Sequence, residues 1–98
     1  MTCAEIVTFR TKDGVADSAY LAAAQKLDGW LKSCPGFITR RLSKSEDGLW
    51  TDYLEWTSKD AAVKAGEGFM SQPAALAMME LSIEESFAMR HEPILLAA

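Results

Sequence analysis

Two strand-like segments separated by a short polar loop place the strongest constraint on the fold of this chain. Residues 37–42 and 49–56 are rich in β-branched and aromatic types, and the loop Ser45-Glu46-Asp47-Gly48 lies between them. An Asp-Gly pair in such a loop is typical of a β-hairpin, because glycine adopts the left-handed backbone conformation that tight turns need. The sequence therefore predicts an antiparallel strand pair in the middle of the chain.

A helical segment joins the first strand of this hairpin to an earlier strand. Residues 5–11 alternate polar with apolar side chains and predict that earlier strand. Asp17 or Ser18 can cap a helix that runs to about residue 33, where Pro35-Gly36 turns the chain into the hairpin. Apolar residues recur in this helix at helical spacing and form one face: Tyr20, Ala24, Leu27, Trp30 and Leu31.

The second half of the chain repeats the pattern of helix followed by strand. We expect a helix over residues 59–65 that breaks near Gly66-Glu67-Gly68, because each glycine costs about 1 kcal/mol relative to alanine. Pro73 suits the first turn of another helix over residues 74–81. Residues 86–91 then have strand character.

The order of strand, helix, strand, strand, helix pair and strand is that of the split β-α-β, or ferredoxin-like, fold. Because crossovers between strands are right-handed, the order predicts a four-stranded antiparallel sheet with its first and third strands in the centre and the helices on one face. A chain of 98 residues suffices for one hydrophobic core, so we expect residues 1–98 to form a single domain of the α+β class.

The strand over residues 49–56 carries bulky side chains on both of its faces. Alternation places Trp50, Asp52, Leu54 and Trp56 on one face, and Leu49, Thr51, Tyr53 and Glu55 on the other. The helices cover only one face of the sheet, and a chain this short has nothing else to cover the second. We therefore expect a homodimer that pairs through the sheet face, with a different protein partner as the alternative.

The charge of the chain argues against nucleic acid as a partner. The net charge is −4, the isoelectric point is near 4.9 and the basic residues are scattered.

No apolar segment approaches the ~20 residues of a membrane span and no signal-peptide pattern opens the chain, so we expect a cytoplasmic protein. Cys3 and Cys34 fit no metal-binding spacing and are expected to be free thiols. Nucleotide-binding, P-loop, hydrolase-elbow and zinc-protease motifs are missing from the sequence.

Several short motifs stand along the chain in a recognisable order. They are Pro35-Gly36-Phe37, Glu46-Asp47-Gly48 with Trp50, Trp56 followed by Ser58 and an alanine-rich helix, and the closing Met89-Arg90-His91. This set resembles the antibiotic biosynthesis monooxygenase-like family over nearly the whole chain. The resemblance implies a dimeric α+β barrel with a pocket for a small aromatic or other apolar molecule between each sheet and its helices. Some members oxidise polycyclic phenols to quinones without a metal or organic cofactor, whereas others degrade haem or isomerise small metabolites.

The residues that carry the chemistry in such oxygenases are only partly present. In quinone-forming members an Asn lies four residues before the Trp of this strand, and the matching residues here are Asp52 and Trp56. The sequence contains no Asn, so neither this pattern nor the Asn-Trp-His pattern of the haem degraders is complete. Two hypotheses follow: a monooxygenase-like enzyme without metal or organic cofactor, and a noncatalytic ligand-binding or structural homodimer.

Asp52 and His91 are the candidate catalytic residues. Asp52 lies between the tryptophans of its strand, where desolvation would make it a stronger base; alternatively it faces solvent or pairs with a strand arginine such as Arg40. His91 is the only histidine and can exchange protons near neutral pH if it faces the pocket; alternatively it is a surface or hydrogen-bonded residue. Neither has the neighbours that a metal site requires.

The candidate ligand-binding residues offer flat aromatic surface or an adaptable thioether: Trp56, Tyr53, Trp50, Phe69 and Met89. Residues of these types also build hydrophobic cores, which is the alternative for each. The Gly66-Glu67-Gly68 segment is the expected mobile gate, because glycine loosens a helix.

Overall fold

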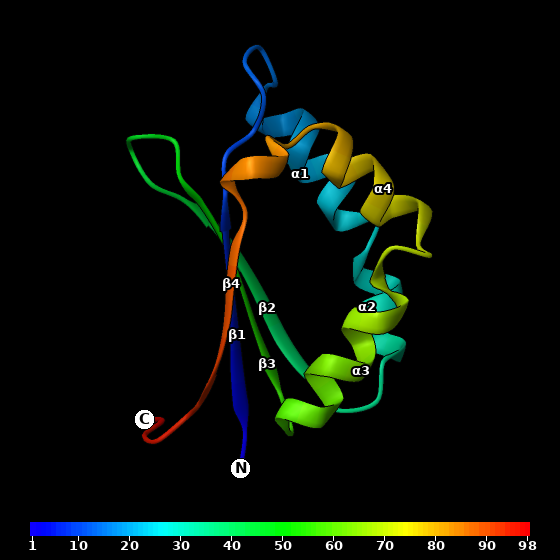
Figure 1. The fold of residues 1–98 in the computed structure, drawn as a ribbon, viewed down its shortest axis with the longest axis vertical. Coiled ribbons are helices and arrows are strands. Elements are labelled where there is room, and N and C mark those ends of the chain that lie inside the picture. Colours follow the sequence, from blue (N-terminus) through cyan, green and yellow to red (C-terminus); the bar gives the residue numbers. More distant parts are fainter.

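The computed structural model describes residues 1–98 and has the predicted order of strands and helices (Figure 1). One antiparallel sheet in the order β2-β3-β1-β4 contains β1 (Cys3–Phe9), β2 (Phe37–Lys44), β3 (Trp50–Trp56) and β4 (Ala88–Pro93). The first and third strands are central, as the right-handed crossovers require. The α+β, ferredoxin-like fold that the sequence predicts is confirmed.

All helices lie over the same face of this sheet (Figure 1). Between β1 and β2 come α1 (Asp17–Gln25) and α2 (Asp28–Ser33), and between β3 and β4 come α3 (Lys59–Phe69), α4 (Pro73–Glu80) and the 3-10 turn η1 (Glu84–Ser86). None of these helices has the length and apolar character that crossing a membrane requires.

The single helix predicted over residues 17–33 is in fact divided into α1 and α2. At the division, the Lys26 and Leu27 backbone N–H groups donate to the carbonyls of Ala23 and Ala24 at 3.2 and 3.1 Å. These bonds span three residues instead of four, so the backbone tightens there and changes direction. The sequence shows no glycine or proline at this position.

The break predicted at the glycines of α3 is also wrong. The helix continues through Gly66 and Gly68 and ends at Phe69. The Phe69 ring packs against Trp30 of α2, with ring centroids 6.4 Å apart. Such a tertiary contact outweighs the modest helix propensity that the two glycines lose.

The last strand begins later than predicted. Ser86, expected in that strand, lies in η1, where its hydroxyl donates to the Ile83 carbonyl at 2.6 Å and accepts from the Arg10 backbone N–H at 2.8 Å. These bonds hold the turn that delivers the chain to β4 at Ala88.

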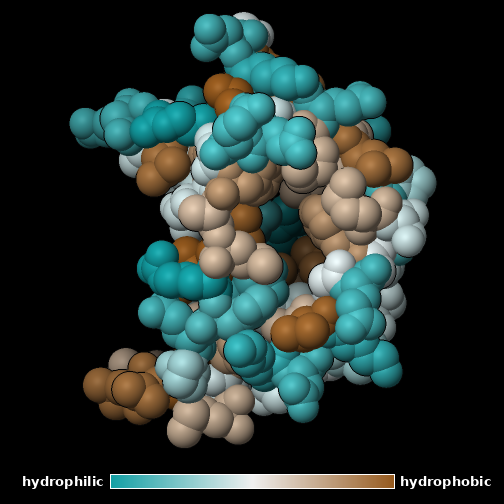
Figure 2. Space-filling model, viewed as in Figure 1, coloured by the Kyte–Doolittle hydropathy of each residue, from teal (hydrophilic) through white to brown (hydrophobic).

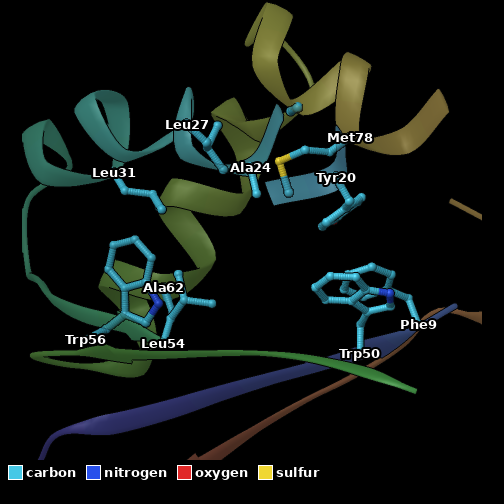
Figure 3. Packing of buried hydrophobic residues seen from close by; sticks show 11 residues of the cluster. Phe9, Tyr20, Ala24, Leu27, Leu31, Trp50, Leu54, Trp56, Ala62 and Met78 are labelled. Carbon is cyan, nitrogen blue, oxygen red and sulfur yellow. The ribbon is translucent and has the colours of Figure 1, made fainter. Parts of the chain in front are cut away.

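The hydrophobic core lies between the sheet and the helices and has two ends (Figure 3). At one end Tyr20 of α1 contacts Phe9 and Trp50, with ring centroids 5.2 and 5.0 Å away. At the other end Trp56 and Leu54 of β3 lie opposite Leu31 and Ala62. The helix-facing side chains of β3 are all buried, which confirms the alternation predicted for this strand.

The opposite, open face of the sheet is more polar than the sequence analysis expected. Its central row runs from Arg90 through Ile6 and Tyr53 to Arg41. The rows on either side consist mainly of threonine, serine and glutamate residues: Thr8, Thr51 and Ser43 on one side, and Glu92, Ala4, Glu55 and Thr39 on the other. Bulky apolar residues on this face are therefore confined to its middle.

Candidate functional site

A cavity of about 380 Å³ separates the two ends of the core. Figure 2 shows it as a hollow between the sheet and the helices. It is lined by 20 residues, of which 16 are hydrophobic, and its volume falls within the ~300–1,000 Å³ of small-molecule sites. The lining and the volume suit a small apolar ligand.

The mouth of the cavity lies beside the edge strand β4. Met89 of β4 and Met70 at the end of α3 both line the cavity, yet they are 63% and 52% exposed. No strand pairs with the outer side of β4, so the sheet ends at this strand. Methionines adapt their shape at low cost, which suits them to a ligand entrance.

Asp52 lies in the cavity wall and is paired with Arg40 of the neighbouring strand. The guanidinium donates two hydrogen bonds to the carboxylate, from Nε to Oδ1 at 2.9 Å and from Nη2 to Oδ2 at 2.7 Å. The side chains of Arg40 and Asp52 are only 9% and 11% exposed. This is the pairing that the sequence offered as the alternative to a free general base.

Further acceptors complete the surroundings of Arg40. Its Nη1 donates to the Ala24 carbonyl at 2.9 Å and to Asp28 Oδ1 at 3.2 Å. Burial by itself would lower the pKa of Arg40, but the hydrogen bonds and charges of Asp52 and Asp28 outweigh it and raise that pKa. The arginine therefore stays charged and holds α1, α2 and the sheet together.

Glu5 is the second carboxylate of the cavity wall, and the sequence analysis did not select it. It projects from the central strand β1, and His91 lies directly across from it on β4. Glu5 Oε1 and His91 Nε2 are 3.2 Å apart, and the two side chains are 16% and 15% exposed. A polar residue on the same strand face as Val7 and Phe9 is the signal that would have identified Glu5.

The environment of Glu5 raises its pKa. Burial is the main cause, the hydrogen bond and charge of His91 oppose it, and the charge of Asp52 adds to the increase. A carboxylate in this setting is a better proton acceptor than one in water.

Two further groups could bind a ligand oxygen. Trp56 lines the cavity, and its buried Nε1 has no hydrogen-bond partner in the chain. Tyr20 also lines the cavity; burial and then the charge of Asp52 raise its pKa to about 12, so its hydroxyl stays protonated at neutral pH. Both can donate a hydrogen bond to an acceptor on a bound molecule.

Three of the five predicted ligand-binding residues line the cavity and two do not. Trp56, Phe69 and Met89 line it. Trp50 is instead a core residue, stacked on Phe9 with ring centroids 6.1 Å apart. Tyr53 lies on the open face, where its hydroxyl donates to Glu55 Oε2 at 3.1 Å, so its prediction as a pocket wall is wrong.

Of the predicted catalytic pair, Asp52 lines the cavity and His91 reaches it only through Glu5. No three His, Cys, Asp or Glu side chains come together as metal ligands. The glycines expected to act as a gate lie within an unbroken helix, where Gly66 lines the cavity, and the gate itself stays a prediction.

Comparison with protein-family models and with curated proteins gives no match. Solved structures match over nearly the full chain. SnoaB, a cofactor-independent oxygenase from Streptomyces nogalater, is 18% identical with a TM-score of 0.76, over 98% of this chain and 95% of that chain. A putative antibiotic biosynthesis monooxygenase from Bordetella bronchiseptica is 17% identical with a TM-score of 0.82, over 97% and 98%.

A third structure contains a ligand. The ActVA-Orf6 monooxygenase of Streptomyces coelicolor, in complex with Nanaomycin D, is 20% identical with a TM-score of 0.71, over 98% of this chain and 89% of that chain. The chain has the fold of the antibiotic biosynthesis monooxygenases. At these identities the likeness establishes the fold, so the activity has to be argued from the cavity.

Proposed function

We propose that the protein binds a fused-ring phenol in its cavity and oxidises it with O2 to a quinone, without a metal or organic cofactor. The observation that carries this proposal is a largely apolar cavity of about 380 Å³ with a buried carboxylate, Glu5, in its wall. SnoaB is a cofactor-independent oxygenase, and the ActVA-Orf6 monooxygenase was solved with Nanaomycin D, which supports chemistry of this kind on this fold.

The reaction needs no external reductant. Loss of the hydroxyl proton converts the phenol to a phenolate, which is rich enough in electrons to reduce O2. One oxygen atom enters the ring as the second carbonyl of the quinone. The other leaves as water, together with the hydroxyl hydrogen and the hydrogen of the oxidised carbon. 1-Naphthol and O2 thus give 1,4-naphthoquinone and water.

The cavity lining matches the demands of such a substrate. Trp56 and Phe69 provide flat apolar surface for the rings, and the unpaired Trp56 Nε1–H can donate to the phenolate oxygen. A donor in a dry site stabilises the negative charge more than water-exposed donors do. The polar residues of the cavity wall therefore suit the hydroxyl end of the phenol, and the apolar residues suit its rings.

Oxygen uptake and ligand binding together test the proposal. An oxygen electrode with 1-naphthol and 9-anthrol should show catalysed uptake of one O2 for each quinone formed. Ala65 lines the cavity, so Ala65→Phe should fill it and reduce binding, measured by quenching of tryptophan fluorescence. Ala22→Phe, on the exposed side of α1, is the matched control and should leave binding unchanged.

The alternative of a noncatalytic ligand-binding protein has a distinct outcome. The pairing of Asp52 with Arg40 favours it, because it leaves the carboxylate predicted as a base without a free role. Binding that is lost in Ala65→Phe, without any catalysed oxygen uptake, would establish that alternative and reject the oxygenase.

We also propose that two copies pair through the open face of the sheet. The central row of this face ends in Arg90 and Arg41, and the neighbouring row contains Glu92 and Glu55. A two-fold axis can set the arginine row of one copy against the glutamate row of the other, since such an interface is self-complementary. A partner would also bury Ile6 and Tyr53, which lie between these charges.

A further inference from the structure

We infer that Glu5 is the general base of the proposed oxidation and that His91 positions Glu5 and carries its proton from the cavity to water. This inference rests on the proposed function, because it assigns the group that takes the phenol proton. Neither residue stands at Asp52 or Trp56, the two positions that match the Asn and Trp of quinone-forming oxygenases.

The geometry places Glu5 between the cavity and the edge of the sheet. Its neighbours on the same face of β1, Val7 and Phe9, line the cavity with it. His91 is its cross-strand partner, 3.2 Å away, and does not line the cavity. The carboxylate therefore faces the bound ligand on one side and the imidazole on the other.

Glu5 is the one carboxylate of the cavity wall without a cationic guanidinium bound to it. Asp52 on β3 is the other, and both of its oxygens accept hydrogen bonds from Arg40 of β2. The helices contribute no charged side chain to the lining. Taking a proton at Asp52 would break its charge pair with a buried arginine, which is costly, whereas taking one at Glu5 would not.

His91 supplies the exit for the proton. The phenol O–H bond breaks and a carboxyl O–H bond forms on Glu5. When the neutral imidazole holds its own proton on Nδ1, the Glu5 proton can pass to His91 Nε2 and Nδ1 then releases its proton to water, because each ring nitrogen can bind one proton. His91 lies on the edge strand and its side chain is 15% exposed, so it connects the dry cavity to solvent.

Kinetics of variants at this pair test the inference. Glu5→Gln keeps the shape of the side chain and removes the base, so kcat for 1-naphthol should fall about 100-fold or more while KM changes little. Glu5→Asp keeps a carboxylate and should recover part of that loss. Glu46→Gln in the exposed β2–β3 loop is the control for the same change of charge and should match the wild type.

The pH profile separates a positioning role of His91 from a structural one. His91→Gln should lower kcat less than Glu5→Gln and should move the acid limb of the kcat profile to higher pH, because His91 lowers the pKa of Glu5. The carboxyl signal of Glu5 in a carbon-detected NMR titration should shift in the same direction. An unchanged acid limb would overturn the role of His91.

The proposed function and the assignment of Glu5 fail differently. A wild-type protein that catalyses no oxygen uptake with either phenol overturns the proposed function. Uptake in the wild type that survives Glu5→Gln at the same kcat overturns only the assignment of Glu5.

Discussion

Two carboxylates face the same cavity, and their partners give them different roles. Asp52 is held by two hydrogen bonds from Arg40, whereas Glu5 meets a single imidazole. A buried carboxylate with a charged guanidinium partner is a structural element, because its charge is balanced and each of its oxygens accepts a hydrogen bond. A buried carboxylate beside a histidine retains the capacity to take a proton.

Removal of Asp52 should therefore destabilise the protein strongly. Asp52→Ala leaves the 9% exposed Arg40 side chain with only the half-exposed Asp28 as a charged partner. We expect the free energy of unfolding to decrease by about 3 kcal/mol, the lower end of the ~3–5 kcal/mol lost when a buried pair is broken. Urea denaturation measures this. The double variant Arg40→Met/Asp52→Leu should recover most of the lost stability. If Asp52→Ala lost less stability than Asp28→Asn, the prediction would be contradicted.

The raised pKa of Glu5 should make the stability of the protein depend on pH. A carboxyl whose folded-state pKa lies above its ordinary value of 4.5 binds its proton more tightly in the folded state. Its contribution to stability is therefore present below pH 4.5 and is lost as the pH rises through the folded-state pKa. Glu5→Gln lacks this loss, so its free energy of unfolding relative to the wild type should increase with pH.

Urea denaturation of the two proteins between about pH 4 and about pH 8 gives this difference. Glu46→Gln, at an exposed position, is the control and should follow the wild type throughout. A difference between Glu5→Gln and the wild type that falls with rising pH would show that the His91 contact outweighs burial.

At the scale of single residues, the sequence predicted well which side chains share a face of a strand. It predicted less well which residues those side chains contact. Alternation correctly placed Asp52 and Trp56 on one face of β3, and the structure shows that this face lies under the helices. The same alternation should have excluded Tyr53, which cannot share a wall with its neighbour Asp52. The pairs Asp52–Arg40 and Glu5–His91 depend on strand register, and no local pattern of one strand specifies its register with another.

At the scale of the helices and strands, a particular residue specifies some of the connecting turns but not others. The turn from α2 into β2 depends on Gly36, whose φ is +84°. A Cβ at this position would lie 2.6 Å from Thr57 Oγ1 and 2.7 Å from Ala61 Cβ. The glycine thus serves both the turn and the close approach of α3. By contrast, the turn between α1 and α2 has no such residue, which is why the sequence did not predict it.

Gly36→Ala should cost more than the same change at another left-handed glycine. Gly14 also has a φ of +84°, but nothing lies within 4 Å of a Cβ built there. Both variants should lose about 1–2 kcal/mol of stability for the backbone conformation. Gly36→Ala should lose about 1–3 kcal/mol more for the collision with Thr57 and Ala61. Equal losses in thermal or urea unfolding would show that α3 moves aside freely.

For the whole molecule, the order of elements was sufficient to predict the fold, because the hairpin and the right-handed crossovers leave one arrangement of four strands. The cavity could not be predicted in the same way. It exists because the core residues gather at two ends, around Tyr20 and around Leu31, and leave a space between them. Its size depends on how far α3 and α4 stand from the sheet, which no periodic pattern in the sequence encodes.

The open face of the sheet leads to a prediction about assembly. Ile6 stands in the middle of that face, so a second copy should bury it, and light scattering should give about twice the chain mass of 10.7 kDa. Ile6→Glu would place a charge where the partner packs and should give a monomer. Val63→Glu, on an exposed apolar position of α3, makes the same chemical change away from the sheet and should remain a dimer. A wild-type protein that scatters as a single chain at micromolar concentration, or an Ile6→Glu variant as dimeric as Val63→Glu, would contradict pairing through this face.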